Sequence, residues 1–252
     1  MGARKIPLLA LLSLPLECAG RRLGQACPSC GAVAMRVCGS TADASLARLE
    51  ALAEPILLDA GAVLIREGDE APHIFNITSG SVRVFKRLPN GRRQIIGFLF
   101  RGDFLGLAIG DEYVFTAEAM EPSSVCRFRK TAFRALVQDD PPLEHALLNR
   151  TSHELAAAQN QMLLLGRKTA IERLASFLLD LPNHDLSRPA GAGHVRLPMT
   201  RGEIADYLGL TIETVSRSIT RLKTQGVIRL VSQTDVLVER PDLLRALAEG
   251  EP

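Results

Sequence analysis

The chain has 252 residues, which suits two compact domains or one large one. Hydrophobic residues make up 46% of it and aromatic residues only 4%, with no Trp, so the core must be mostly aliphatic. The formal net charge of +2 is too small to indicate a polyanion-binding protein by itself, so contact with nucleic acid would need locally clustered basic groups. No run of apolar residues approaches the roughly 18 that a membrane span requires, and we expect no membrane partner.

The N-terminal segment contains an apolar stretch, residues 6–16, that follows two basic residues and resembles a short secretory signal. Pro7 and Pro15 interrupt this stretch, and Glu17 is not the small residue that a cleavage site needs beside Cys18. We therefore expect no signal peptide and a cytoplasmic protein. The sequence assigns no role to residues 1–26.

The five cysteines are an odd number, and four of them lie in one short segment. This argues against a secreted disulfide framework and favours a metal site or a redox role in a reducing compartment. Cys27, Cys30 and Cys38 are spaced C-x2-C-x7-C, and Cys126 lies far along the chain. The spacing alone leaves an iron–sulfur cluster, a structural zinc ion and a reversible dithiol open. Cys126 alone is more typical of a small buried core residue.

Residues 41–142 have the pattern of a β-rich domain. A helix is predicted over 43–52, and short strands are predicted over 62–66, 73–79, 81–87, 92–99, 114–119 and 124–129. Asn90-Gly91 between two of these strands is a strong hairpin signal. Many short strands at this spacing predict a sandwich or a barrel.

A single helix is predicted over 143–166, after Pro141 and Pro142. Its apolar and small residues recur at alternating spacings of three and four, which is the pattern of helices that pair side by side. These seam residues are Leu148, Thr151, Leu155, Ala158, Met162 and Leu165. The alternative is that this face packs on the chain's own barrel.

Residues 167–252 predict a winged helix-turn-helix, after a hinge at 166–168 and a helix over 169–181. Thr200 and Glu203 form a capping-box pattern, Gly209 suits the turn, and Thr211 can cap a second helix. That second helix has Ile212, Val215, Ile219 and Leu222 on its apolar side. Two strands and a short helix over 242–248 follow, so the whole chain is predicted to be α+β.

The polar side of the second helix has the groups that base reading requires. Arg217 can bind guanine through two hydrogen bonds, Glu213 can accept from cytosine, and Ser216 can contact a base or a phosphate. The other predicted DNA contacts are Thr211, Thr214, Arg221 and Lys223, of which the last two suit phosphates. The alternative is an ordinary solvated helix face. No nucleophile–base pair is suggested by spacing, so we do not expect an enzyme.

The stretch TRGEIADYLGLTIETVSRSITRLKTQG resembles the DNA-binding motif of the CRP/FNR superfamily of bacterial transcription regulators, and its Glu213, Ser216 and Arg217 resemble the base-reading set of the FNR branch. The likeness extends from about Cys27 to the C-terminus. It implies a jelly-roll barrel of the cyclic-nucleotide-binding type, a dimer that pairs through residues 143–166, and recognition of a palindromic TTGAT-type site. It also implies a [4Fe–4S] cluster held by Cys27, Cys30, Cys38 and Cys126, and contacts with RNA polymerase.

Two departures from the family pattern matter. Phe115, Thr116 and Ala117 stand where nucleotide-binding members have a phosphate-binding Arg, so we expect no cyclic nucleotide. Asn160 aligns with a seam position where FNR-type members often have an acidic residue, which leaves open a cluster-independent dimer. The sequence thus predicts an arm (1–40), a sensory barrel (41–142), a dimerisation helix (143–166) and a DNA-binding domain (167–252). The rival interpretation is a constitutive or thiol-redox regulator with structural zinc.

Overall fold

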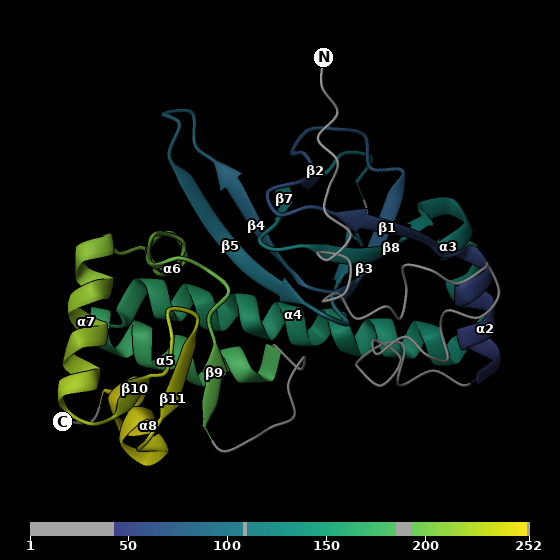
Figure 1. Ribbon diagram of the computed structural model, residues 1–252. Helices are drawn as coiled ribbons and strands as arrows, with labels where there is room; N and C mark the ends of the chain where they lie inside the picture. The colour runs from purple at the N-terminus through teal and green to yellow at the C-terminus, as the bar shows by residue number, and fades with distance from the viewer. Residues whose placement is uncertain (1–42, 108–109, 185–192, 251–252) are drawn as a thin grey trace, which may run out of the picture.

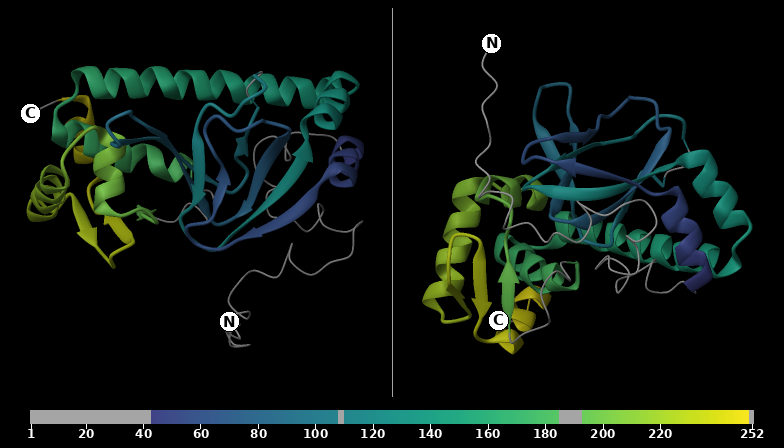
Figure 2. Two further views of the ribbon diagram at one scale, coloured as in Figure 1. Left: turned by 90° about the horizontal axis from the view of Figure 1, so that it is seen from above. Right: turned by 45° about the vertical axis from the view of Figure 1, so that its right-hand side comes forward.

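The computed structural model describes residues 43–107, 110–184 and 193–250. Within these ranges a β-rich domain is followed by one long helix, α4 (Pro141–Arg167), and by a C-terminal domain of helices with a small sheet. Figures 1 and 2 both show α4 extending from α3, past the barrel, to the C-terminal domain. The predicted α+β organisation is confirmed.

The N-terminal domain consists of two four-stranded antiparallel sheets, ordered β1-β8-β3-β6 and β2-β7-β4-β5. Its strands are β1 (Glu54–Leu58), β2 (Val63–Ile65), β3 (His73–Ser79), β4 (Ser81–Arg87), β5 (Arg93–Phe100), β6 (Phe104–Leu105), β7 (Thr116–Ala119) and β8 (Ser123–Arg129). Aliphatic side chains from both sheets, among them Ile77, Val82 and Val125, are buried in one cluster. This packing confirms the predicted jelly roll. No helix in the described ranges is long and apolar enough to cross a membrane.

The sharp turns of the barrel use glycines with positive φ. Gly80 has φ 79°, and a Cβ placed there would lie 2.2 Å from Ser123 Oγ, so only glycine fits. The resemblance to the cyclic-nucleotide-binding family also implies a sharp turn at Gly97, but Gly97 lies inside β5. There the pairing register shifts between Val84 and Phe85, as at a β-bulge, so that expectation was wrong.

An apolar cluster joins the barrel to helices α2 (Asp43–Leu52), α3 (Lys130–Gln138) and α4. The sequence did not predict α3. Asp140 caps α4 by accepting a hydrogen bond from Leu143 N at 3.1 Å, and prolines occupy the first positions of the helix. α4 therefore begins two residues before its predicted start. It ends at Arg167, where Lys168 has an extended backbone (φ −82°, ψ 144°).

The C-terminal domain packs four helices on a three-stranded sheet of order β10-β11-β9. Its elements are α5 (Ala170–His184), β9 (His194–Arg196), α6 (Arg201–Leu208), α7 (Ile212–Thr224), β10 (Ile228–Leu230), β11 (Asp235–Val238) and α8 (Pro241–Glu249). α5 runs past its predicted end at residue 181. The core of this domain also includes Phe85, Ile95 and Phe98 of the barrel hairpin β4–β5, so the two domains pack directly on each other.

Candidate nucleic-acid interface and cysteine position

The first helix of the predicted motif, α6, is held by the capping box that the sequence indicated. Thr200 Oγ1 accepts from Glu203 N at 3.2 Å, and Thr200 N donates to Glu203 Oε2 at 2.7 Å. Gly209 ends the helix with φ 62° and ψ 40°, in the left-handed region that favours glycine. The tight turn and the start of α7 follow at once, so the helix-turn-helix is confirmed.

The second helix, α7, has one buried stripe and one exposed face. Thr211 caps it by accepting from Thr214 N at 3.2 Å. Val215, Ile219 and Leu222 are buried, as predicted. Ile212 is 47% exposed, so its predicted place on the apolar side was wrong, and Ser218 is only 8% exposed. Val215 and Leu222 lie at the middle of the buried stripe and Ser218 at one edge, and Ile212 lies in the first turn, beyond the core.

The predicted base-reading residues lie together on the exposed face of α7. Glu213, Ser216 and Arg217 are all exposed, and Arg217 Nε donates to the carbonyl oxygen of Glu213 at 3.4 Å. Hydrogen bonds from its own backbone N–H and from Thr211, with the charge of Arg217, lower the pKa of Glu213. This carboxylate is therefore an ionised acceptor. Arg221 and Lys223 are exposed in the last turn, and Thr214 is partly buried.

The predicted seam on α4 is largely exposed. Every residue from 151 to 160, including Thr151 and Ala158, is exposed to solvent. Leu148, Leu155 and Met162 are 62%, 59% and 66% exposed, which is unusual for large apolar side chains on one helix. Leu165 differs, because it is partly buried and packs on the core of the C-terminal domain.

Asn160 does not lie on this seam. Because α4 is a regular helix here, Asn160 is rotated by about 200° from both Ala158 and Met162. It lies one turn before Leu164, which is buried against the C-terminal domain. Asn160 therefore lies away from the predicted seam, whose nearest member is Ala158, and its part in a dimer stays a prediction.

Of the four predicted metal ligands, Cys27, Cys30 and Cys38 lie outside the described residues. Cys126 lies on β8, opposite Pro55 of β1 and Asn76 of β3. It is half-buried and packs against the cluster that includes residues of α2 and α3. Among the described residues, no three His, Cys, Asp or Glu side chains are grouped as metal ligands. The four-cysteine site stays a prediction.

The residues expected to replace a phosphate-binding site belong to the barrel wall. Ala117 is fully buried on β7, and Phe115 packs against the barrel core. Thr116 Oγ1 accepts a hydrogen bond from Glu67 N at 3.2 Å. These contacts are structural, and whether a nucleotide binds here stays a prediction.

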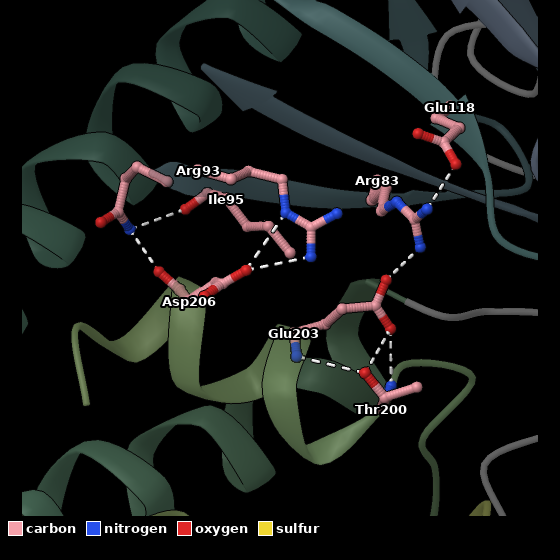
Figure 3. A network of polar contacts seen from close by, with 8 residues as sticks. Arg83, Arg93, Ile95, Glu118, Thr200, Glu203 and Asp206 are labelled. Carbon is pink, nitrogen blue, oxygen red and sulfur yellow. Dashed lines mark hydrogen bonds and ion pairs between the residues drawn. The ribbon is translucent and has the colours of Figure 1, made fainter. Parts of the chain in front are cut away.

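A polar contact between the two domains was not predicted from the sequence. Arg93 of β5 donates to Asp206 of α6 at 3.0 Å, and Arg83 of β4 bonds to Glu203 of α6 (Figure 3). These partners are more than a hundred residues apart, and no local signal in the sequence links them.

Comparison with known proteins matches residues 55–140 to the cyclic nucleotide-binding domain family and residues 172–247 to the Crp-like helix-turn-helix domain family. The chain is 37% identical over 225 residues to the nitrogen fixation regulation protein FixK of Bradyrhizobium diazoefficiens, covering 89% of this chain and 94% of that protein. It is 36% identical over 228 residues to the transcriptional activator protein FnrL of Cereibacter sphaeroides, with coverages of 89% and 91%. The solved structure of FixK2 from Bradyrhizobium japonicum aligns with a TM-score of 0.72 and 36% identity, over 77% of this chain and 96% of that one.

Proposed function

Because the chain belongs to the CRP/FNR superfamily of DNA-binding transcription regulators, we propose that it is an oxygen-responsive, cytoplasmic member of that superfamily. It binds a palindromic TTGAT-type site as a homodimer while a [4Fe–4S] cluster is intact, and it loses DNA affinity when oxygen converts the cluster. The observation that carries the DNA-binding part is the exposed face of α7, where Glu213, Ser216 and Arg217 stand together above a buried stripe. Its relatives are regulators, and the protein is not an enzyme.

On DNA, α7 is the recognition helix. Arg217 has the two parallel donors that match guanine O6 and N7, and the ionised Glu213 can accept from cytosine N4. Arg221 and Lys223 contact phosphates, which contribute affinity without sequence information. We expect the promoter-bound protein to contact RNA polymerase.

The exposed seam of α4 supports the dimer. A second copy of the same helix would cover Leu148, Leu155 and Met162, which otherwise contact water. A two-fold dimer also matches a palindromic site, because each recognition helix then meets one half-site.

The position of Cys126 fits a cluster that takes its other ligands from the preceding segment. The chain passes from Cys38 to the start of α2 at Asp43, and α2 shares an apolar cluster with Cys126. Four cysteine thiolates are the usual ligands of a [4Fe–4S] cluster, and such a group would supply the oxygen-sensitive centre. The described residues supply one of these thiolates.

Contacts also link α2 to the start of α4, the predicted dimerisation helix. A hydrogen bond from Ser45 of α2 is the main cause that lowers the pKa of Asp140, and Arg48 of the same helix lies 3.7 Å from that carboxylate. Asp140 in turn caps α4. We propose that a change in the cysteine segment reaches the dimerisation helix through these contacts.

The test is to purify the protein without oxygen and to measure iron, sulfide and zinc, with Cys18→Ser as the matched control for Cys126→Ser. We expect about four irons and four sulfides per chain in the wild type and in Cys18→Ser. Cys126→Ser should lose both the cluster and anaerobic DNA binding. About one zinc per chain and no sensitivity to air would instead support the structural-zinc regulator.

We also propose that the barrel binds no cyclic nucleotide, because Phe115, Thr116 and Ala117 provide no cation for a phosphate. Calorimetric titration with cyclic AMP and cyclic GMP should show no heat of binding. Binding at micromolar concentration would show that the barrel has a ligand as well as the proposed cluster.

A further inference from the structure

The sensory barrel holds the first helix of the helix-turn-helix through two sets of charged contacts. Arg93 of β5 donates through Nε and Nη2 to Asp206 Oδ2 at 3.1 and 3.0 Å. Arg83 of β4 bonds to both Glu203 of α6 and Glu118 of β7. Figure 3 shows both arginines reaching from the hairpin onto the same face of α6. We call the set Arg83, Arg93, Gln94, Glu203 and Asp206 the hairpin–helix contact.

Neutral groups reinforce this contact. Gln94 Nε2 donates to the backbone oxygen of Asp206 at 2.5 Å, which fixes the helix backbone and not only its side chains. The ring of Phe98 on β5 lies 5.3 Å from the ring of Tyr207 on α6, and both rings contact Phe177 of α5. The hairpin–helix contact thus continues the shared apolar core of the two domains.

The charged side chains of this contact are partly buried, so removing one of the charges should change the stability of the protein measurably. The side chains of Arg83 and Glu203 are 19% and 7% exposed, whereas those of Arg93 and Asp206 are 30% and 36% exposed. Burial opposes ionisation of Glu203, but hydrogen bonds from Thr200 and the charge of Arg83 together hold its pKa below the ordinary value. Glu203 is also the capping-box residue of α6, so the hairpin contacts the first turn of the DNA-binding motif.

The backbone alone does not fix how the two domains are oriented. α4 and α5 are joined through Lys168, whose extended conformation breaks the helix, and rotation there would swing the whole C-terminal domain. The other described contacts to α6 include Gln161 of α4, whose Nε2 donates to the oxygen of Tyr207 at 3.0 Å. The hairpin–helix contact is therefore placed to select one orientation of α6 and α7 relative to α4.

We propose that Arg83 and Arg93 are positioning residues for DNA recognition: through Glu203 and Asp206 they set the orientation of each recognition helix relative to the dimer seam, and hence the half-site spacing that the dimer accepts. This inference rests on the proposed dimeric reading of a palindrome. Neither arginine contacts DNA in this role. Their effect is on the geometry of two linked helices, because specific half-sites must lie at a spacing that matches the protein.

The first experiment tests the contact without DNA. Arg93→Gln, Asp206→Asn and the double variant are compared in chemical unfolding, with Arg92→Gln, the exposed neighbour, as the matched control. We expect the two single changes to be non-additive, as for residues in direct contact, and Arg92→Gln to have almost no effect. Strictly additive effects would overturn the hairpin–helix contact, whatever the protein does on DNA.

The second experiment tests positioning. Binding is measured on palindromes with the matched spacing and with one or two extra base pairs between half-sites. We expect Arg93→Gln to lose about tenfold of the preference for the matched spacing, equal to about 1.4 kcal/mol, while Arg92→Gln keeps it. The charge reversal Arg93→Asp with Asp206→Arg should restore the preference.

Two outcomes would contradict different parts of the proposal. If Arg93→Gln weakens binding equally at every spacing, or keeps the wild-type preference, the positioning role is overturned although the dimer reads its site. If the wild type binds no palindrome better than a single half-site, the proposed dimeric function fails. The unfolding cycle then still decides whether the contact exists, but spacing selection by Arg83 and Arg93 is overturned as well.

Discussion

α7 and the middle of α4 are both regular helices with a repeating pattern, but they turn opposite kinds of side chain to the solvent. In α7 the apolar residues other than Ile212 face inward, with Val215 and Leu222 0% exposed, and the charged residues face out. In α4 the apolar residues Leu155 and Met162 face out, at 59% and 66% exposed. The apolar side of α7 is buried within the chain itself. The apolar residues of α4 are left exposed, and only contact with another molecule would bury them.

A charge placed on the α4 seam is expected to have the largest effect. Leu155→Glu would put an unpaired carboxylate at the centre of the proposed interface, so it should weaken dimerisation by about 3 kcal/mol or more, roughly a hundredfold. Sedimentation equilibrium measures this directly. Asn160→Glu adds the same charge on the side of α4 away from the seam and should leave the dimer intact. Equal effects of the two changes would show that the helices do not pair through this face.

The inward side of α7 is tested by removing core volume. Leu222→Ala leaves a cavity in a fully buried site, so it should lower the free energy of unfolding by about 2–5 kcal/mol. Lys223→Ala, on the exposed side of the same turn, should change it by less than about 0.5 kcal/mol. Denaturant unfolding without DNA measures both. Similar values for the two variants would contradict the division of α7 into a core side and a free side.

The outward side of α7 is tested on DNA. Arg217→Ala should cost about 1–3 kcal/mol of binding free energy and relax discrimination at one base pair, because a bidentate base contact is lost. Arg221→Ala should weaken binding to all sequences alike, because a phosphate contact carries no sequence information. A set of single-base operator variants separates the two results. A uniform loss for Arg217→Ala would make it a phosphate contact instead.

Local signals in the sequence were enough to predict the helix-turn-helix and several strands. The bounds of β3 and β4 match the prediction, although β3 pairs with the distant β8. The Thr200–Glu203 capping box and the left-handed Gly209 depend on residues close together in the chain. Such features are set by backbone hydrogen bonds and turn chemistry, which a short stretch already specifies.

What the sequence could not show depends on packing between distant residues. Ile212 was misplaced because the extent of the buried stripe is set by where α7 meets the rest of the C-terminal core. β6 has only two residues and forms against β3, and so its own sequence carries too little pattern. The pairing of Arg93 with Asp206 joins two domains that a linear pattern treats separately.

The smallest expected effect on stability comes from removing the N-cap of α7. The middle of α4 needs no such cap, because its backbone N–H groups already have partners within the helix. Thr211 Oγ1 accepts from Thr214 N, a donor that lacks a partner inside the helix. Thr211→Ala should therefore destabilise the domain by about 1 kcal/mol, whereas Thr211→Ser keeps the acceptor and most of the stability. Ser152→Ala, in the exposed middle of α4, should have almost no effect on unfolding. If Thr211→Ser and Thr211→Ala are equally unstable, the methyl group and not the cap holds the start of the recognition helix.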